Sequence, residues 1–313
     1  KIDVVNEVTQ FKAFEAMPVH CFESMHRAFL KVQDGCNQFC SYCAIPFARG
    51  RERSLNHEQV IQIAKDLCDK GHTEIVLTGI HTGRYDDGEY DLAKLMKALL
   101  ENTPDSVYYR ISSIEITEVS DALIALMKEN PRMCHHLHIP VQSACNETLR
   151  RMNRPYTIEE FKEKINYIRS CIPDISISTD VIAGFVQESD EEFETTYENL
   201  ADLELSFFHV FPYSKRNGTK ASTLKGEING KVAKARVARL LELSNACRER
   251  DMKRFNPVQV LIERKQDGYY TGYTNQYHSC KILSDTPLSG RITIEWDRIE
   301  DGTYYGKKDV VCD

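Results

Sequence analysis

Short apolar runs alternate with amphipathic segments along most of this chain, from residue 29 to residue 255. Brief apolar runs that end at glycine or polar residues are typical of buried strands, whereas apolar residues spaced three and four apart predict helices. Six strand–helix units in succession predict an α/β fold, a parallel sheet covered by helices and curled into a barrel or part of one. A closed barrel of this kind has eight units, so six units fall short of closure.

The six predicted strands share an apolar composition, and a polar residue or a glycine follows each of them. They cover residues 29–33, 74–78, 107–114, 136–142, 175–183 and 207–211. Helices are predicted between them, around residues 57–70, 92–99, 119–127 and 157–170 and from residue 189 onward. Asn56 is the expected cap of the first helix, while Thr157 and Ser189 each open a capping box with a glutamate three positions later.

A long basic helix over residues 230–255 follows this core, and the texture of the sequence then changes. Proline disfavours helical backbone in the residue before it, so Asn256-Pro257 is expected to end the helix. Short strands and turns at 258–262, 268–273, 278–283 and 291–296 predict a small all-β barrel. The expected divisions are a leading segment at 1–27, the core at 28–228, a connecting helix at 229–256 and the barrel at 257–313.

Three cysteines, Cys36, Cys40 and Cys43, lie on the loop after the first predicted strand with a C-x3-C-x2-C spacing. Thiolates are the usual ligands of iron–sulfur clusters, and three on one short loop can hold three irons of a 4Fe–4S cubane. With no fourth cysteine nearby, one iron would stay open to a small molecule, which favours chemistry over a purely structural role. A zinc knuckle is the alternative, but zinc usually takes four ligands in pairs and no second pair follows nearby.

Polar groups follow the predicted strands at the sheet edge that carries the cysteine loop, where folds of this kind place their sites. Hydroxyl, amide and carboxylate groups there suit the ammonium, carboxylate and ribose groups of a small molecule. Alternatively these residues only form turns, or Glu115 and Asp180 pair with Arg110 or Arg154. The candidate cofactor contacts are Thr78, Gly79, Glu115, Gln142 and Asp180.

Basic and aromatic residues also gather in the segments that follow the strand ends. Such groups can contact phosphates and stack on bases, although charged runs are more often a solvated surface. The candidate substrate-binding residues are Arg49, Arg51, His81, Arg154, Tyr213, Lys215 and Arg216. Four tyrosines of the small barrel, Tyr269, Tyr270, Tyr273 and Tyr277, offer further stacking surfaces, although a purely structural barrel is equally consistent with them.

Overall charge and cysteine content restrict the location of the chain and its partners. A formal net charge of −7 argues against indiscriminate nucleic-acid binding but leaves room for a local basic surface. No run of 18 or more apolar residues is present, so no membrane-spanning helix is expected. Eleven cysteines in a long chain without a secretory leader predict a reducing cytoplasm in which most thiols are free.

The cysteine spacing, with Tyr42 immediately before the last cysteine, resembles the signature of radical S-adenosylmethionine (SAM) enzymes. Further blocks between residues 28 and 312 are similar to the methylthiotransferases of that superfamily. They include Phe29-Leu-Lys-Val-Gln-Asp-Gly-Cys36, His138-Ile-Pro-Val-Gln-Ser143, Thr179-Asp-Val-Ile-Ala-Gly-Phe185 and Phe211-Pro-Tyr-Ser-Lys-Arg216. The block Leu77-Thr-Gly-Ile-His-Thr-Gly83 resembles the subgroup that acts on N6-threonylcarbamoyladenosine (t6A), next to the anticodon of tRNA.

This resemblance implies an open six-unit (βα)6 partial barrel of the TIM type, followed by a TRAM-like RNA-binding β-barrel. It implies that Cys36, Cys40 and Cys43 hold a 4Fe–4S cluster, that SAM binds the open iron, and that Tyr42 packs beside the cofactor. The expected activity converts a C–H bond of t6A into C–S–CH3, with tRNA and a flavodoxin- or ferredoxin-like electron donor as partners. A second, auxiliary 4Fe–4S cluster would belong to an N-terminal domain, so the chain is expected to be a fragment whose residues 1–27 are a linker or remnant.

Two alternatives to this activity stay open at the level of sequence. One is a methylthiotransferase for another substrate, either isopentenyladenosine in tRNA or a ribosomal protein. The other is an RNA-binding module with a structural metal. Two blocks also depart from the family pattern: Gly184-Phe-Val-Gln-Glu188 replaces Gly-Phe-Pro-Gly-Glu, and Gln142-Ser-Ala-Cys145 replaces Gln-Ser-Gly-Ser. Both departures are expected to stiffen the backbone and reshape the cofactor pocket.

Overall fold

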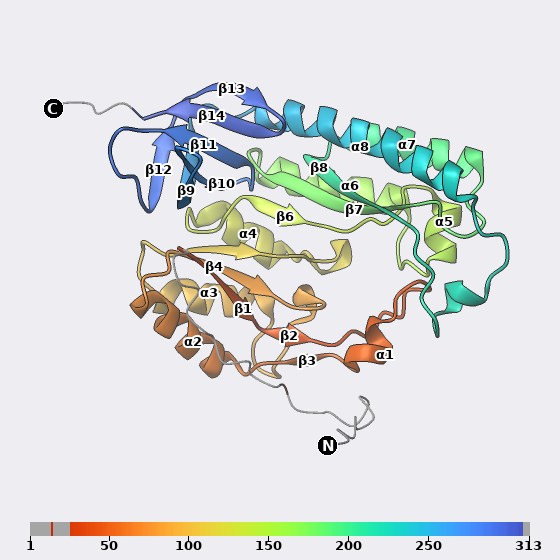
Figure 1. The fold of residues 1–313 in the computed structure, drawn as a ribbon. Helices are drawn as coiled ribbons and strands as arrows, with labels where there is room; N and C mark the ends of the chain where they lie inside the picture. The colour runs from red at the N-terminus through yellow and green to blue at the C-terminus, as the bar shows by residue number, and fades with distance from the viewer. Residues whose placement is uncertain (1–13, 15–25, 309–313) are drawn as a thin grey trace, which may run out of the picture.

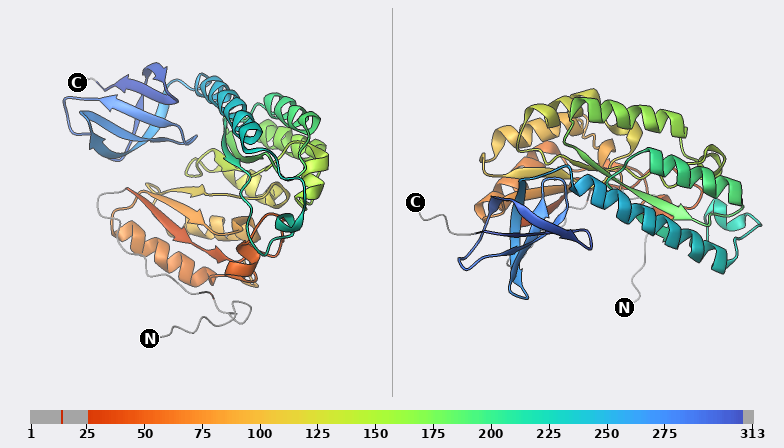
Figure 2. Two further views of the ribbon diagram at one scale, coloured as in Figure 1. Left: turned by 45° about the vertical axis from the view of Figure 1, so that its right-hand side comes forward. Right: turned by 90° about the horizontal axis from the view of Figure 1, so that it is seen from above.

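A curved parallel sheet with helices on its outer side forms the core of the computed structural model (Figure 1 and Figure 2). Its two halves have the strand orders β1-β4-β5 and β6-β7-β8, and every neighbouring pair is parallel. The Cys134 N–H donates to the Tyr109 carbonyl over 2.8 Å and thereby joins the halves between β5 and β6. The strands are β1 (Arg27–Lys31), β4 (Glu74–Thr78), β5 (Tyr108–Ile111), β6 (His136–His138), β7 (Ser176–Ala183) and β8 (Phe207–Pro212). The predicted open six-unit α/β barrel is confirmed.

The structure describes residue 14 and residues 26–308. Most of the leading segment predicted at 1–27 therefore lies outside the described residues, as do Cys21 and Cys312 and the last residues of the small barrel. The division of the chain into domains stays a prediction.

The predicted strand at 136–142 forms β6 only over His136–His138. Pro140 has no N–H to donate to a neighbouring strand, so the ladder is interrupted there. The chain returns to the sheet at Gln142, whose N–H donates to the Asp180 carbonyl over 2.8 Å while its own φ is +69°. This end of β6 is thus irregular where it approaches the cysteine loop.

Two other boundaries differ from the prediction by a few residues. The segment 107–114 forms β5 only over Tyr108–Ile111, because the residues after it make single hydrogen bonds to β4 and β6 instead of a ladder. The helix predicted at 119–127 begins at Asp121, because the Ser120 side chain accepts the N–H of Leu123 and caps it.

Helices cover the outer face of the sheet and bury its apolar side chains. The predicted cap at Asn56 and the capping boxes at Thr157 and Ser189 are confirmed. None of the helices among the described residues is both long and apolar enough to cross a membrane. The outer helices are α2 (His57–Asp69), α3 (Leu92–Asn102), α4 (Asp121–Glu129), α5 (Asn146–Arg151), α6 (Ile158–Cys171) and α7 (Asp190–Asp202).

The long helix α8 (Gly230–Met252) runs beside β8, the last strand of the core sheet (Figure 1). Its Ser244 hydroxyl accepts the Phe208 N–H over 2.8 Å and donates to the Phe208 carbonyl over 2.9 Å. One side chain therefore satisfies backbone groups that an edge strand would otherwise expose. The helix ends three residues before the predicted position, Phe255, with Lys253 as its C-cap.

A six-stranded sheet forms the small barrel, in the order β12-β9-β10-β11-β14-β13. Its strands are β9 (Val258–Gln266), β10 (Tyr269–Thr274), β11 (Ser279–Leu283), β12 (Arg291–Ile294), β13 (Trp296–Glu300) and β14 (Thr303–Lys307). Only Glu295 separates β12 from β13, yet they lie at opposite edges, so the sheet curls back on itself. The predicted strand at 291–296 joins β12 to the first residue of β13, and β14 was not predicted, because its short run Thr303-Tyr-Tyr ends at Gly306 and Lys307, which have low strand preference.

The small barrel lies beside the ends at which the core strands begin (Figure 1), and a buried carboxylate ties it to the core there. Glu74, at the start of β4, is 0% exposed and pairs with Arg27 (2.8 Å), Arg110 (3.0 Å) and Arg291 (2.7 Å). Arg291 belongs to β12 of the small barrel, and Arg110 also donates to the Asn275 carbonyl over 2.9 Å. The core and the small barrel therefore share one ionic network, which fixes their relative position.

Candidate functional site

The cysteine loop leaves the sheet through a short hairpin, β2 (Gln33–Asp34) paired with β3 (Arg53–Ser54). Gly35 begins the loop at φ +77°, and the Cys36 N–H donates to the Gly50 carbonyl over 3.1 Å. On the other side, the Ser41 N–H donates to the Met152 carbonyl over 2.9 Å, beyond α5. One backbone hydrogen bond thus closes the loop on itself, and the other ties it to the segment after α5.

All three cysteines face one cavity of about 200 Å³ at the carboxyl ends of the core strands. Predicted site residues from distant parts of the sequence line the same cavity, as the parallel sheet leads one to expect. They are Cys36, Cys40, Tyr42, Cys43, His81, Glu115, Gln142 and Arg154. Thr78, Gly79 and Asp180, which were also predicted as cofactor contacts, do not line it.

The donor set at this cavity fits an iron–sulfur cluster. The three thiols are free and partly exposed, and no fourth cysteine lines the cavity among the described residues. Burial raises the pKa of the Cys43 thiol, and its neighbours Cys40 and Cys36 raise it further. Three thiolates so close together need metal cations to compensate their charge, and a coordinating thiol is deprotonated by its metal. The site therefore suits a metal-bound state with one coordination position left for another ligand.

His81 lies beside the first cysteine, in the segment that follows β4. Its Nδ1 is 3.7 Å from the Cys36 sulfur, and its Nε2 is 2.7 Å from a Glu118 carboxylate oxygen. Burial lowers the pKa of His81, but these two partners outweigh burial and raise it to about 10. A protonated imidazole there stabilises negative charge on the Cys36 sulfur. The contact supports a role near the cluster, whereas the predicted contact of His81 with substrate stays a prediction.

Residues that sequence reasoning missed hold His81 in place. The Gln33 side chain accepts the His81 N–H over 2.7 Å, and a Glu52 carboxylate oxygen lies 3.3 Å from the imidazole. Glu52 lies in the charged run at 49–53, directly after the cysteine loop, so the sequence could have suggested it as a residue of the site. The sequence gives no such indication for Gln33 and Glu118, because only the fold brings them to His81.

Arg154 is the buried cation of the site. It donates to the Glu115 carboxylate, to the Pro140 carbonyl (2.9 Å) and to the Cys40 sulfur (3.5 Å). Burial raises the pKa of Glu115, and the guanidinium of Arg154 opposes that rise. Of the partners considered for Glu115, the structure selects Arg154. One guanidinium thus links a carboxylate of the cavity to one of the three thiols.

Tyr42, an aromatic residue of the cavity wall, packs against rings that follow β7 and β8. Tyr42 meets Phe185 edge to face at 6.4 Å between ring centroids, and Tyr213 meets the same ring at 5.1 Å. Tyr42 therefore lines the cavity, and Phe185 packs between it and Tyr213. That Tyr42 packs beside the cofactor stays a prediction.

The remaining candidates lie away from the cavity. Lys215 forms an exposed ion pair with Glu227 at 2.6 Å, and Arg51 covers the Phe39 ring at 5.4 Å. Arg49 and Arg216 are exposed. These four residues could contact a large substrate around the site but not a small molecule within it. Asp180 pairs with His138 at 3.3 Å rather than with Arg110 or Arg154.

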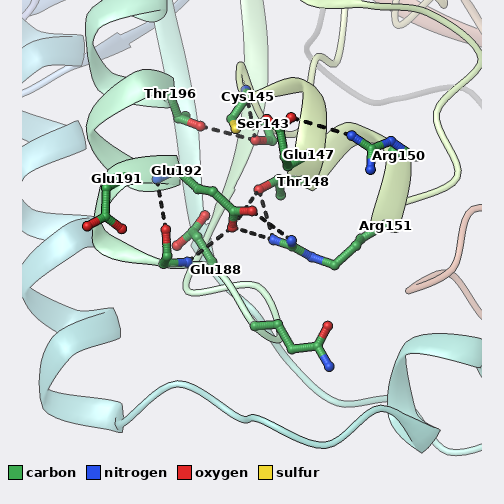
Figure 3. A network of polar contacts seen from close by, with 12 residues as sticks. Ser143, Cys145, Glu147, Thr148, Arg150, Arg151, Glu188, Glu191, Glu192 and Thr196 are labelled. Carbon is green, nitrogen blue, oxygen red and sulfur yellow. Dashed lines mark hydrogen bonds and ion pairs between the residues drawn. The ribbon is translucent and has the colours of Figure 1, made fainter.

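One of the two loops that depart from the family pattern, at 142–145, is bonded to α7, and an ion pair beside it links α5 to α7 (Figure 3). Arg151 forks onto the Glu192 carboxylate at 2.7 and 2.5 Å, and the Ser143 and Thr196 hydroxyls are 3.1 Å apart. Gln187 has φ +66°, in the region that glycine favours. The backbone therefore keeps a glycine-like conformation at the position where the family pattern has glycine.

A Gly35→Ala variant is expected to lose most of its cluster although all three cysteines remain. A Cβ at this position would lie 2.0 Å from the Arg51 carbonyl oxygen, and φ is +77°. Strain of this kind costs about 1–3 kcal/mol before the clash is counted. Iron per chain after anaerobic reconstitution is the measurement. Gly71→Ala is the matched control, because Gly71 has φ +89° with nothing within 4 Å; equal iron in the two variants would contradict the expectation.

Comparison with known proteins agrees with this geometry. The family model described as the radical SAM superfamily matches residues 30–200. The threonylcarbamoyladenosine tRNA methylthiotransferase MtaB of Bacillus subtilis is 37% identical over 93% of this chain and 66% of its own length. MtaB of Chlamydia pneumoniae is 34% identical over 94% of this chain and 70% of its own length. The tRNA-2-methylthio-N(6)-dimethylallyladenosine synthase of Thermodesulfovibrio yellowstonii is 36% identical over 83% of this chain and 61% of its own length.

Solved structures share the fold at low sequence identity. Methylornithine synthase (PylB) superposes with a TM-score of 0.52 at 14% identity, over 71% of this chain and 62% of its own. Coproporphyrinogen III oxidase (HemN) of Escherichia coli superposes with a TM-score of 0.52 at 16% identity, over 71% of this chain and 52% of its own. The chain spans about two thirds of the length of the two MtaB relatives.

Proposed function

Because the chain belongs to the methylthiotransferase family of the radical SAM superfamily, we propose that it is the catalytic core of an enzyme that methylthiolates t6A in tRNA. The observation that carries this proposal is the single cavity that holds three cysteines together with side chains from several strand ends. The choice of t6A rests on the block at 77–83, and the two MtaB relatives at 34–37% identity support it. The dimethylallyladenosine synthase at 36% identity keeps isopentenyladenosine as the alternative substrate.

Cys36, Cys40 and Cys43 would hold a 4Fe–4S cluster, and SAM would bind its open iron. When bound, this pair supplies one-electron cleavage of a sulfonium, and the protein supplies placement and shielding. His81 and Arg154 provide positive charge beside the Cys36 and Cys40 sulfurs. Glu115 and Gln142 line the same cavity and are the proposed contacts to the cofactor's polar groups.

The small barrel offers a surface suited to RNA. A hollow of about 720 Å³ on its sheet is lined by Tyr269, Lys281, Arg298 and Tyr305, among others. Arg298 covers the Tyr305 ring at 4.2 Å, and Tyr269 meets that ring edge to face at 5.9 Å. Cations beside aromatic rings suit phosphates and unpaired bases. Tyr277, predicted to serve there, instead lies under Arg110 at 4.8 Å, in the contact with the core.

The complete reaction would need parts beyond these residues. A second, auxiliary 4Fe–4S cluster in an N-terminal domain would handle the sulfur, and a flavodoxin- or ferredoxin-like protein would donate the electron. The cytoplasm, where tRNA is modified, is the proposed location.

The substrate is tested by comparing tRNAs that differ only at the base next to the anticodon. The chain with its cluster is expected to bind tRNA carrying t6A about tenfold more tightly than tRNA with plain adenosine, or roughly 1.4 kcal/mol. Equal binding of the two tRNAs would contradict the t6A assignment. Tighter binding of isopentenyladenosine tRNA, or of a ribosomal protein alone, would establish one of the alternatives.

A further inference from the structure

Three metal-ligating side chains converge inside the curved sheet, outside the cysteine cavity. His138, Asp180 and His209 project from the neighbouring strands β6, β7 and β8, and their donor atoms all lie within 4.8 Å of one another. His138 Nε2 is 3.3 Å from an Asp180 oxygen, and the two imidazole centroids are 5.7 Å apart. Strands hold side chains more rigidly than loops do, so this arrangement is built into the sheet.

Hydrogen bonds behind these groups fix the orientation of His138. Its Nδ1 is 2.9 Å from the Ser178 hydroxyl, and the same hydroxyl is 3.0 Å from Nε2 of the buried His136. With Nδ1 engaged in this way, Nε2 is the nitrogen that faces Asp180. A ligating histidine typically has its second nitrogen held by such a partner, which sets the ring and its tautomer.

The charges around the three side chains also suit a cation. Asp180 supplies a carboxylate, and each imidazole offers a nitrogen lone pair of the kind a metal requires. Two guanidinium groups lie nearby and have other partners: Arg110 pairs with Glu74 at 3.0 Å, and Arg248 covers the Phe207 ring at 4.6 Å.

We propose that His138, Asp180 and His209 bind one divalent transition-metal ion, such as Zn²⁺ or Fe²⁺. Two histidines and one carboxylate are a common ligand set for these ions and leave coordination positions open. His138 and His209 line a cavity of about 190 Å³ together with Phe29 and Phe207, so an open position would face that space. The site is independent of the proposed function, since it uses none of the cysteines.

Zinc binding to the cluster-loaded chain tests this site directly. With iron and sulfide filling the cysteine loop, the chain is equilibrated with Zn²⁺ under anaerobic conditions, and zinc per chain is measured by elemental analysis. One zinc per chain is expected, and X-ray absorption at the zinc edge should show only nitrogen and oxygen neighbours at about 2.0–2.2 Å. Sulfur neighbours at about 2.3 Å would place the zinc at cysteines and overturn the proposal.

Two conservative variants assign the ligands. Asp180→Asn and His209→Gln should each weaken zinc binding by about 100-fold, the upper end of losses seen when a supporting group of a metal site is removed. His135→Asn is the matched control, because His135 forms a surface pair with Asp174 at 2.8 Å and should leave affinity unchanged. No zinc in the parent chain, or unchanged affinity in both variants, would overturn the site whatever the chain does to SAM or tRNA.

Discussion

A Glu74→Gln variant is expected to lose about 3–5 kcal/mol of the free energy of unfolding, the usual effect of breaking a buried ion pair from one side. Glu74 is fully buried and faces Arg27, Arg110 and Arg291, so a neutral amide would leave three guanidinium groups without their shared anion. Urea denaturation at neutral pH measures the loss. Glu249→Gln, which breaks an exposed pair with Lys253, is the control and should change stability by less than about 0.5 kcal/mol. A Glu74→Gln loss as small as that of the control would contradict the expectation.

The same carboxylate predicts a pH dependence. Burial opposes ionisation of Glu74, but the three guanidinium groups outweigh burial and hold its pKa far below the usual carboxyl range. A carboxyl whose pKa is depressed on folding stabilises the fold at pH values above its unfolded pKa, about 4.3. That contribution is lost as the pH falls below this value. The difference in free energy of unfolding between the parent chain and Glu74→Gln should therefore decrease from pH 5 to pH 3. A difference that stays constant over this range would contradict a depressed pKa of Glu74.

Replacement of Arg154 by Met should damage the site most among changes that spare the cysteines. Met leaves the largely buried Glu115 carboxylate without its cation, which costs about 3–5 kcal/mol in comparable pairs. It also removes the donor to the Cys40 sulfur, so iron per chain after reconstitution should fall together with stability. Arg154→Lys should retain more iron per chain and more stability than Arg154→Met, because lysine keeps the positive charge but lacks the planar set of donors of a guanidinium.

Arg150→Met controls for the loss of a basic residue in the same segment. Arg150 is exposed and its nearest carboxylate oxygen, on Glu147, is 3.4 Å away, so iron content and stability should both stay near those of the parent chain. If Arg150→Met and Arg154→Met had the same iron content and the same stability, the contacts of Arg154 would not be what supports the site.

The strands and the cysteine loop could be predicted because their signals are local. Apolar runs, capping boxes and the C-x3-C-x2-C spacing each lie within a few residues. The parallel order of the strands then brings Glu115, Gln142 and Arg154 to the cysteines without further information. Pro140 shows the limit of prediction from local signals. The apolar run predicts a strand of seven residues at 136–142, but Pro140 lacks an N–H, and β6 has only three residues.

Contacts that depend on the packing of distant segments could not be predicted. The sequence predicts Asp180 as a cofactor contact because it lies in the fifth strand, but its side chain lies beside His138 and His209. Nothing in the sequence distinguishes Glu74 from the first residue of any buried strand, although it organises the contact between the core and the small barrel. The sequence predicts that Tyr277 stacks on RNA, yet its ring packs against His136 at 5.1 Å in that contact. Each case depends on which face a neighbouring strand or barrel presents.

The most direct test of the central claim is 5′-deoxyadenosine formation by the chain alone. After anaerobic reconstitution with iron and sulfide, the chain is incubated with dithionite and SAM. A brown protein that forms 5′-deoxyadenosine, with no product from Cys43→Ala, is the predicted result. A colourless protein that binds zinc at the cysteines and forms no product would contradict the account and leave an RNA-binding module with a structural metal.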